Sequence, residues 1–314
     1  MYHRPKFSIV VPCYNGRAVI QRSLTSILSQ TFIEFECLII NDASTDNTLE
    51  VISSFTNDER IRVVSLVNNS GVHAARNKGI EQARGEFILF LDCDDELFVN
   101  ALEVFNDYIL NNPDGGLFFA NYITPNGKIS GLKVTESGFV SYSDLICLKL
   151  SRELKPSIPL IKTDIAKRFS FKAPNTDFIF YRYVMRETKT YCMTDVLGKY
   201  NIEDVEGAMH IVRKVPNVNR SILRAKALDA FLNDFKEDYL KYCPVLYSDY
   251  SYGVAIGFLL DWNIVGAYKS SFEAMYYSNF KLKYTILFIF SIIPISPALL
   301  RITFATKRFL MSSK

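Results

Sequence analysis

Apolar segments of strand length alternate with helix-like segments over the first part of the chain. Strands are predicted at residues 7–11, 35–40, 61–67 and 87–91. Helices, in which apolar residues recur every three or four positions, are predicted at residues 17–30, 46–55 and 72–83. Strands joined by crossover helices pair in parallel. The alternation therefore predicts an α/β fold with a mostly parallel central sheet flanked by helices.

Each of these predicted strands ends in acids or amides. The polar segments are Pro12–Gly16, Asn41–Asp46, Asn68–Gly71 and Asp92–Asp95. Because the carboxyl ends of parallel strands meet at one edge of a sheet, where open α/β sheets bind ligands, the sequence predicts a binding site there. Asp92 and Asp94 would offer hard oxygen ligands to a divalent cation and to the phosphates that it bridges. An acidic loop without a ligand is the alternative.

The charge distribution separates the C-terminal region from the rest. From Ala274 onward the chain has six Lys and Arg and no acid, which leaves 30 bases against 33 acids in the remainder. Because this remainder is mildly acidic and shows no basic stripe with interleaved aromatics, nucleic acid is not an expected partner. The six cysteines form no CxxC pair, so no zinc site is predicted.

The C-terminal tail, residues 281–314, combines bases with an apolar segment. Tyr284 to Leu300 is a stretch of 17 uncharged residues between Lys283 and Arg301. It is shorter than the ~20 residues of a membrane span, so we expect it to lie on a membrane surface. An apolar hairpin packed on the body or on a second subunit, as in a possible homodimer, is the alternative. Residues 217–243 upstream predict one long amphipathic helix.

Five segments of the first half carry recognisable motifs. They are FSIVVPCYNG at 7–16, LTSILSQTF at 24–32, LIINDASTDNT at 38–48, GVHAARNKG at 71–79 and GEFILFLDCDD at 85–95. In this order and spacing they resemble the family 2 glycosyltransferases, enzymes of bacterial polysaccharide synthesis with the GT-A fold. The likeness is looser over residues 97–215 and only general over 216–314. It implies a Rossmann-like α/β domain, followed here by a helical C-terminal extension.

The resemblance implies a site for a nucleoside diphosphate sugar. Asp42 matches the acid that binds a uracil-type base, which favours a UDP-sugar, and Pro12, Tyr14 and Asn15 would flank that base. A helix N-cap or turn residue is the alternative role for Asp42.

The resemblance also implies where the diphosphate binds. Arg76 and Asn77 match a motif that reaches the nucleotide, with a solvated helix arginine as the alternative for Arg76. Asp92 and Asp94 match the Asp-x-Asp motif, so Mn²⁺ or Mg²⁺ is the expected cofactor.

Inverting members of this family use a carboxylate as general base toward the acceptor hydroxyl. Asp177 stands where the family places it, about 80 residues after the metal motif and at the start of the helix predicted over 177–187. Thr176 replaces the usual Glu, and an N-cap residue is the alternative for Asp177. The segment from Tyr200 to Gly207 loosely resembles a loop that closes over the donor.

Together these features predict an inverting, metal-dependent glycosyltransferase. Residues 1–110 would bind the nucleotide sugar, 111–215 the acceptor, and 216–314 would form a helical region ending in the membrane-associating tail. The acceptor would be a glycan or a polyprenyl-linked intermediate. No signal peptide is predicted at Met1–Lys6, so we expect a cytoplasmic protein at the inner face of the cell membrane.

Two other functions remain open from the sequence. A binding protein that keeps the nucleotide pocket without catalysis is one, because Thr176 departs from the family pattern. A sugar nucleotidyltransferase is the other, although it would need a Gly-rich basic loop after the first strand, which Pro12–Gly16 lacks.

Overall fold

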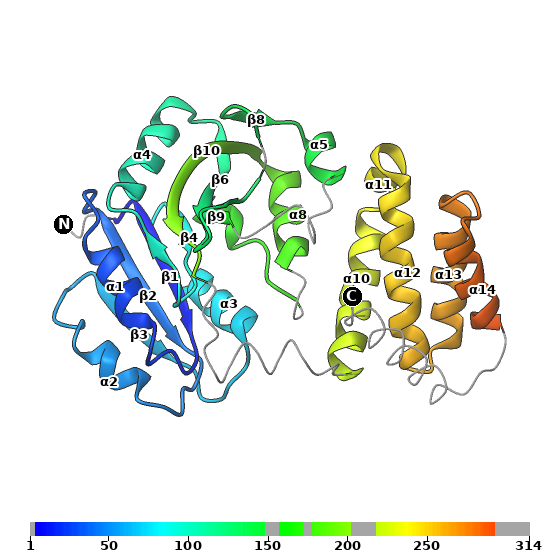
Figure 1. Ribbon diagram of the computed structural model, residues 1–314, viewed down its shortest axis with the longest axis horizontal. Coiled ribbons are helices and arrows are strands. Elements are labelled where there is room, and N and C mark those ends of the chain that lie inside the picture. Colours follow the sequence, from blue (N-terminus) through cyan, green and yellow to red (C-terminus); the bar gives the residue numbers. More distant parts are fainter. Residues whose placement is uncertain (1–3, 133, 148–156, 173–176, 202–217, 293–314) are drawn as a thin grey trace. The chain divides into compact units, whose positions relative to one another are not determined.

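The chain divides into two compact units. The computed structural model describes residues 4–132, 134–147, 157–172, 177–201 and 218–292. One unit comprises residues 1–172 and 180–215, and the other comprises residues 173–179 and 216–314. The first holds the sheet and the second is helical (Figure 1), which confirms the predicted α/β class with a C-terminal helical region. The functional division at residues 110 and 215 stays a prediction.

The first unit contains all the described strands. They are β1 Phe7–Cys13, β2 Phe35–Asn41, β3 Ile61–Ser65, β4 Phe87–Phe90, β5 Glu96–Leu97, β6 Gly115–Ile123, β7 Ile129–Ser130, β8 Gly138–Val140, β9 Ser157–Lys162 and β10 Lys189–Lys199. The helices between them are α1 Ile20–Leu28, α2 Thr48–Ser53, α3 Val72–Gln82, α4 Ala101–Asn111, α5 Tyr142–Cys147, α7 Thr163–Ala166 and α8 Asp177–Glu187. The first three residues of α8 belong to the second unit.

The strands form one sheet in the order β3-β2-β1-β4-β9-β6-β10-β5. Strands β3, β2, β1 and β4 are parallel, as predicted, with Cys13 opposite Asn41. Strand β9 runs antiparallel between β4 and β6, and β10 is parallel to β6. Strands β6 and β10 therefore run in the same direction as β1, and their carboxyl ends lie at the same edge of the sheet. Strands β9 and β10 were not predicted from the sequence.

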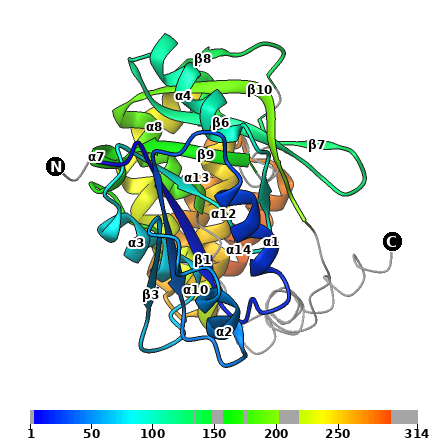
Figure 2. The same ribbon diagram turned by 90° about the vertical axis from the view of Figure 1, so that its left-hand side faces the viewer.

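Helices cover both faces of the sheet. Ile9 and Val11 of β1 are buried in one apolar cluster with α1, α2 and α4, and Val10 is buried in another with α3. Figure 2 shows α1 and α3 on opposite sides of β1. Gly79 lets α3 approach the sheet closely, because a Cβ atom there would lie 2.2 Å from Cγ1 of Val10. The alternation of buried side chains along β1 thus produces a core on each face.

A buried carboxylate joins the amino ends of the parallel strands. Glu36 of β2 is 6% exposed. Its Oε1 accepts hydrogen bonds from Ser8 Oγ at 2.6 Å and from the Arg84 amide at 2.7 Å, and its Oε2 accepts one from Arg62 Nη1 at 2.6 Å. Because the guanidinium pairs the charge and the other donors fill further lone pairs, the cost of burying Glu36 is offset.

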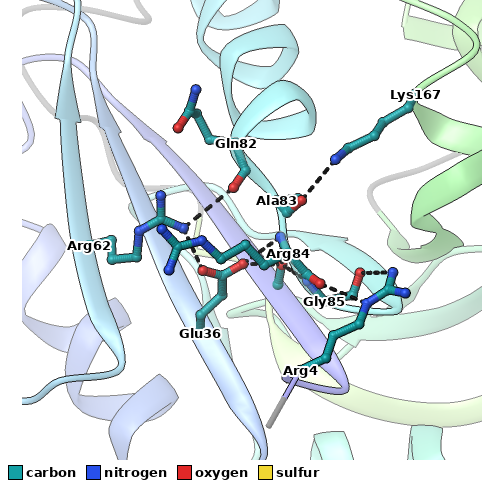
Figure 3. Close-up of polar contacts among 9 residues, drawn as sticks. Arg4, Glu36, Arg62, Gln82, Ala83, Arg84, Gly85 and Lys167 are labelled. Atoms are coloured by element: carbon teal, nitrogen blue, oxygen red, sulfur yellow. Dashed lines mark hydrogen bonds and ion pairs between the residues drawn. The ribbon is translucent and has the colours of Figure 1, made fainter. Parts of the chain in front are cut away.

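Cations also surround the end of α3 at this place (Figure 3). Lys167 Nζ donates to the carbonyl of Ala83 at 3.0 Å, and Arg62 Nη1 lies 3.4 Å from the carbonyl of Gln82. Arg4 donates to the carbonyls of Arg84 and Gly85 at 2.9 and 3.1 Å. Cations at a helix C-terminus complete the unpaired carbonyls and oppose the negative end of the dipole.

The second unit is a stack of helices. They are α10 Val218–Asp234, α11 Lys236–Tyr242, α12 Pro244–Leu260, α13 Ile264–Tyr277 and α14 Leu282–Ile292. The single helix predicted over 217–243 is wrong, because the structure has two helices with Phe235 between them at φ −112°. Phe235 is fully buried against Phe231, with ring centroids 4.6 Å apart. The sequence has no Gly or Pro there, but Asn233 and Asp234, which have low helix propensity, precede the break directly.

The predicted tail is described only in part. Helix α14 buries Tyr284 and Leu287, and residues 293–314 lie outside the described residues. None of the helices in the described ranges combines the length and apolarity needed to cross a membrane.

Candidate functional site

The loops after β1 and β2 are tied together by polar contacts. Asn15, at φ 50°, donates its backbone N–H to Ser44 Oγ at 3.0 Å, and its Oδ1 accepts from the Thr45 amide at 2.8 Å. The Asp42 amide donates to the Cys13 carbonyl at 2.8 Å. The side chain of Asn15 therefore fixes the neighbouring loop. The contacts with a nucleotide base that were predicted for Pro12, Tyr14 and Asn15 stay predictions.

Asp42 holds the start of α3. Its carboxylate is 3% exposed and accepts hydrogen bonds from the amides of Ser70 at 2.8 Å and Gly71 at 2.7 Å. Gly71 precedes α3 at φ 86°, a conformation that other residues resist, so the backbone and not a lack of space favours glycine there. These bonds reach residues 28 and 29 positions along the chain, so they differ from the local N-cap or turn role that the sequence left open. A carboxylate oxygen can accept a second hydrogen bond, so the ligand role stays a prediction.

Arg76 connects α3 to the acidic loop after β4. Its Nη2 lies 2.8 Å from Oδ1 of Asp92, and the two side chains are 14% and 34% exposed. The guanidinium also lies over the ring of Phe171, 5.6 Å from the centroid. Helix α3 thus links Asp42 through Gly71 to Asp92 through Arg76. Asp42, Arg76 and Asp92, which belong to three different motifs, are therefore connected through α3.

Asn77, the neighbour of Arg76, has a different environment. Its Nδ2 donates to the Phe171 carbonyl at 3.0 Å, and its Oδ1 accepts from the Phe171 amide at 2.8 Å. This pair of hydrogen bonds attaches the segment after α7 to α3, across 94 residues of sequence. The structure therefore gives Asn77 a structural contact, and its predicted role toward the nucleotide is not tested by it.

Two residues that sequence reasoning did not select hold the acidic loop. Arg22 of α1 donates to the Asp94 carbonyl through Nε at 3.2 Å and Nη2 at 2.9 Å. Asn201, which follows β10, donates through Nδ2 to the Asp94 carbonyl and to Glu96 Oε1, both at 3.0 Å. The Asn201 amide also donates to Asp95 Oδ1 at 3.0 Å. The only sequence signal for Asn201 was the loose likeness that begins at Tyr200.

Asp95 is the buried acid of this loop. It is 2% exposed, and burial raises the pKa of its carboxyl to about 9, with a further contribution from the negative charges of Asp92 and Asp94. The carboxyl therefore binds a proton near neutral pH. Asp92 and Asp94 are half-buried and remain at the surface of the loop.

Cys93 lies between the two acids. A hydrogen bond with Cys13, together with burial, raises the pKa of its thiol well above the usual value. Mg²⁺ and Mn²⁺ prefer oxygen ligands, so we expect Cys93 to fill space beside Asp92 and Asp94 and not to bind the cation.

The acids of the loop fit a cation that is shared with a ligand. Within the described residues, no group of three or more His, Cys, Asp and Glu side chains could hold a metal ion alone. Mg²⁺ and Mn²⁺ are commonly held by one or two carboxylates together with substrate phosphates. Asp92 and Asp94 can supply such carboxylates, so the donor set fits a cation that is completed by a diphosphate.

Asp177 lies at the first position of α8, as predicted, and is half-buried. Asn175 and Thr176, the rest of the predicted motif, lie outside the described residues, as do Glu206 and Gly207. Because residues 173–179 belong to the second unit, the predicted role of Asp177 as a base stays a prediction.

Two cavities lie beside residues that hold this site, Arg22 and Glu96 in one and Ser70 and Asn77 in the other. One cavity of about 670 Å³ is lined by α1 side chains, residues 96–99 and Lys199, and another of about 450 Å³ lies between residues 66–70 and α3. Neither is lined by Asp92 or Asp94. The connected acids at the carboxyl ends of the strands therefore define the candidate site.

Comparison with known proteins agrees with this geometry. Residues 8–160 match the model of the family described as Glycosyl transferase family 2. The chain is 31% identical over 198 residues to the UDP-Glc:alpha-D-GlcNAc-diphosphoundecaprenol beta-1,3-glucosyltransferase WfgD of Escherichia coli, which covers 58% of this chain and 78% of the relative. The chain spans only 40% and 35% of the length of two other curated relatives.

Solved structures show the same fold. The crystal structure of Staphylococcus aureus TarS in complex with UDP-GlcNAc has a TM-score of 0.58 at 19% identity, covering 87% of this chain and 92% of the other. The mannosyltransferase PcManGT of Pyrobaculum calidifontis, in complex with GDP-Man and Mn²⁺, has a TM-score of 0.53 at 16% identity, covering 91% and 79%. The predicted fold is confirmed by these neighbours and the predicted family by the sequence matches: the chain belongs to glycosyltransferase family 2.

Proposed function

We propose that this protein transfers a sugar from a nucleoside diphosphate sugar, with UDP as the favoured nucleotide, to a hydroxyl group of a glycan or lipid-linked intermediate in cell-surface polysaccharide synthesis. The observation that carries the proposal is the connection of Asp42 to Asp92 through α3 and Arg76, at the carboxyl ends of parallel strands. Membership of glycosyltransferase family 2 supports the same chemistry. The names of WfgD and of the TarS complex, which contain UDP-Glc and UDP-GlcNAc, support the choice of UDP.

The donor would bind across the ends of β1, β2 and β4. Asp42, whose orientation is fixed by the amides of Ser70 and Gly71, would accept hydrogen bonds from the base. Asp92 and Asp94 would hold a Mn²⁺ or Mg²⁺ ion, which neutralises charge on the departing diphosphate when bound. Arg76 already lies against Asp92 and would place a second positive charge beside the phosphates.

The transfer would proceed with inversion. Asp177 would accept the proton of the acceptor hydroxyl group while the oxygen of that hydroxyl attacks the anomeric carbon of the sugar. The bond between that carbon and the diphosphate oxygen breaks, and the leaving nucleoside diphosphate keeps the electron pair. A lipid-linked acceptor would place the protein at the inner face of the cell membrane, and the name of WfgD, which contains a diphosphoundecaprenol acceptor, supports this class.

Ligand binding and turnover are tested separately. Thermal midpoints are measured with UDP-, GDP- and dTDP-sugars, each with and without Mn²⁺, because a ligand stabilises the folded state according to its affinity and concentration. We expect the largest rise with a UDP-sugar and Mn²⁺. A panel in which no nucleotide sugar shifts the midpoint contradicts the proposal.

The proposed base is tested with the matched variants Asp177→Asn and Asp164→Asn. Asp164 is an exposed acid of α7. We expect Asp177→Asn to lower the transfer rate on the order of 1,000-fold without weakening donor binding, and Asp164→Asn to leave the rate unchanged. Unchanged transfer by Asp177→Asn would exclude this base, and donor binding without any turnover by the unmodified protein would favour a binding protein.

A further inference from the structure

Helix α13 has an apolar stripe on its exposed side. Val265, Tyr268, Phe272 and Tyr276 are 81%, 47%, 43% and 53% exposed. Their spacing of three or four residues places them along one side of the helix. Ala267, Ser271 and Ala274 are buried on the other side. A soluble surface rarely gathers several large apolar side chains at such a spacing, so the stripe indicates a surface that binds a partner or a membrane.

Helix α14 extends the stripe into a wider surface. Phe288 lies between the two helices, with its ring centroid 5.3 Å from that of Tyr268 and 5.8 Å from that of Phe272. Leu282, Ile286 and Ile289 are 74%, 43% and 48% exposed. We refer to the exposed apolar side chains of both helices as the α13–α14 face, which comprises Val265, Tyr268, Phe272, Tyr276, Leu282, Ile286 and Ile289. Figure 1 shows the two helices side by side.

Along α13 and α14 lysines outnumber acids, and Asp249 of the neighbouring α12 lies at the same margin through its bond with Lys283. Between Trp262 and Ile292 the only acid is Glu273. Its carboxylate is bound by Lys236 Nζ at 2.7 Å and by Tyr247 Oη at 2.8 Å. Lys269, Lys281 and Lys283 are exposed, and one of them, Lys283, is paired with Asp249. The surface is therefore apolar with a basic margin.

We propose that the α13–α14 face lies on the surface of a membrane that contains anionic lipids. Apolar and aromatic side chains enter the boundary between head groups and acyl chains, and lysines at the margin attract anionic head groups. A second copy of the chain would bring lysines against lysines. Residues 293–314 add four further bases and no acid, so they would oppose this basic margin as well. Charge complementarity thus selects an anionic lipid surface.

The inference goes beyond sugar transfer, and it does not depend on which donor the enzyme uses. It also differs from the membrane contact predicted from the sequence. That prediction began at Lys281, whereas most of the aromatic side chains of this face belong to α13.

The test is flotation of the full-length protein with lipid vesicles. We compare vesicles of phosphatidylglycerol and phosphatidylcholine with vesicles of phosphatidylcholine alone. The protein should float with the anionic vesicles and float less in high salt, because added salt screens the lysine contribution. Absence of flotation with anionic vesicles contradicts the proposal.

A pair of matched double variants identifies the surface. Val265→Ser with Leu282→Ser alters the α13–α14 face, and Leu223→Ser with Val245→Ser removes the same two residue types from exposed positions elsewhere in the helical unit. We expect the first variant to bind anionic vesicles about 10-fold more weakly, and the second to bind as the unmodified protein does. Equal binding by both variants overturns the assignment.

Two further measurements test for a second copy on this face and for damage to the donor site. Light scattering without vesicles reports the oligomeric state, and a dimer that the first double variant dissociates would show that a second copy covers this face, which overturns the proposal. Stabilisation by a UDP-sugar is measured on the same samples. The proposed donor site lies in the other unit, so we expect both double variants to be stabilised by a UDP-sugar as the unmodified protein is. A failure of vesicle binding is thus distinguished from a failure of donor binding.

Discussion

The two ends of the parallel strands use their charged side chains differently. At the amino ends, Glu36 is buried and both of its oxygens are bound, to a guanidinium, a hydroxyl and an amide. At the carboxyl ends, Asp92 and Asp94 stay half-buried, and the pKa of the buried Asp95 is raised by its burial and by the negative charges of these two neighbours. Acids at one end are neutralised by the fold. Acids at the other end are gathered in one loop, where Arg76 pairs with Asp92 and burial together with the neighbouring charges raises the pKa of Asp95.

This difference separates stability from function. Removing one partner of a buried ion pair leaves the other charge uncompensated, and this destabilises the fold. Like charges gathered in one loop disfavour each other, and a cation or a cationic ligand group relieves the repulsion. We therefore expect substitutions at the amino ends to change the stability of the protein, and substitutions at the carboxyl ends to change its activity.

The largest effect is expected for Asp92→Asn. The amide keeps the shape of the side chain but cannot neutralise a cation, so the transfer rate should fall about 1,000-fold, which corresponds to ~4 kcal/mol of activation free energy. The rate is measured as UDP release in the presence of Mn²⁺. Because Arg76 loses its partner, the free energy of unfolding should also fall by about 1 kcal/mol, which is less than for Glu36→Gln since Asp92 is 34% exposed.

Its control is Asp107→Asn, which removes an exposed acid from α4. The control should retain full activity. A large loss of stability in Asp92→Asn, with activity intact in the folded fraction, would assign Asp92 to the fold and break the comparison.

The next largest effect is expected for Glu36→Gln. The substitution leaves Arg62 beside a neutral amide, so we expect the free energy of unfolding to fall by about 3 kcal/mol. Urea denaturation measures it. Glu86→Gln is the matched control, because the Glu86 carboxylate is 47% exposed in its pair with Lys6 and should contribute less than about 1 kcal/mol. Donor affinity should be the same in both variants. A loss of donor affinity in Glu36→Gln alone would show that the amino ends of the strands affect the donor site.

Sequence patterns predicted the part of the structure that depends on local order. The first four strands, the helices between them and the polar segments that follow were all predicted from the order of apolar and polar residues. These features depend on neighbouring residues. The family was also predicted, because five motifs occur in order within 96 residues.

The contacts that build the site could not be predicted in this way. Asn201 reaches Asp95 across 106 residues and Asn77 reaches Phe171 across 94. Such pairs depend on where β10 and the segment after α7 lie in the folded unit, and neither position follows from local periodicity. The antiparallel strand β9 between β4 and β6 was missed for the same reason. The break at Phe235 was missed because the apolar periodicity continues through it, although Asn233 and Asp234 there have low helix propensity.

Asn201→Ala should have a moderate effect on activity. The variant removes two hydrogen bonds to Asp94 and Glu96 but keeps the backbone bond to Asp95. A looser acidic loop should lower kcat/KM for the donor about 10-fold, with little change in the thermal midpoint. Asn57→Ala, at an exposed position, is the control. If added Mn²⁺ at high concentration fails to restore any of the lost activity while the donor KM is unchanged, the loop-holding role is wrong.

The smallest effect is expected for Asn77→Ala. This variant tests where along α3 the donor-binding residues end and the residues that only stabilise the fold begin. Asn77 follows Arg76 directly, yet its side chain is bonded to the backbone of Phe171. We therefore expect the free energy of unfolding to fall by about 1 kcal/mol, with donor affinity unchanged. Urea denaturation and thermal shift with a UDP-sugar measure the two quantities on the same samples.

Lys78→Ala is the control for Asn77→Ala, because Lys78 is the next residue of α3 and pairs with Glu81 at the surface. It should change neither stability nor donor affinity measurably. A weaker donor affinity in Asn77→Ala, with stability preserved, would instead assign Asn77 to the nucleotide, as its motif predicts. The donor-binding residues of α3 would then include Asn77 as well as Arg76. The contrast between residues for stability and residues for activity would apply to the ends of the strands and not to α3.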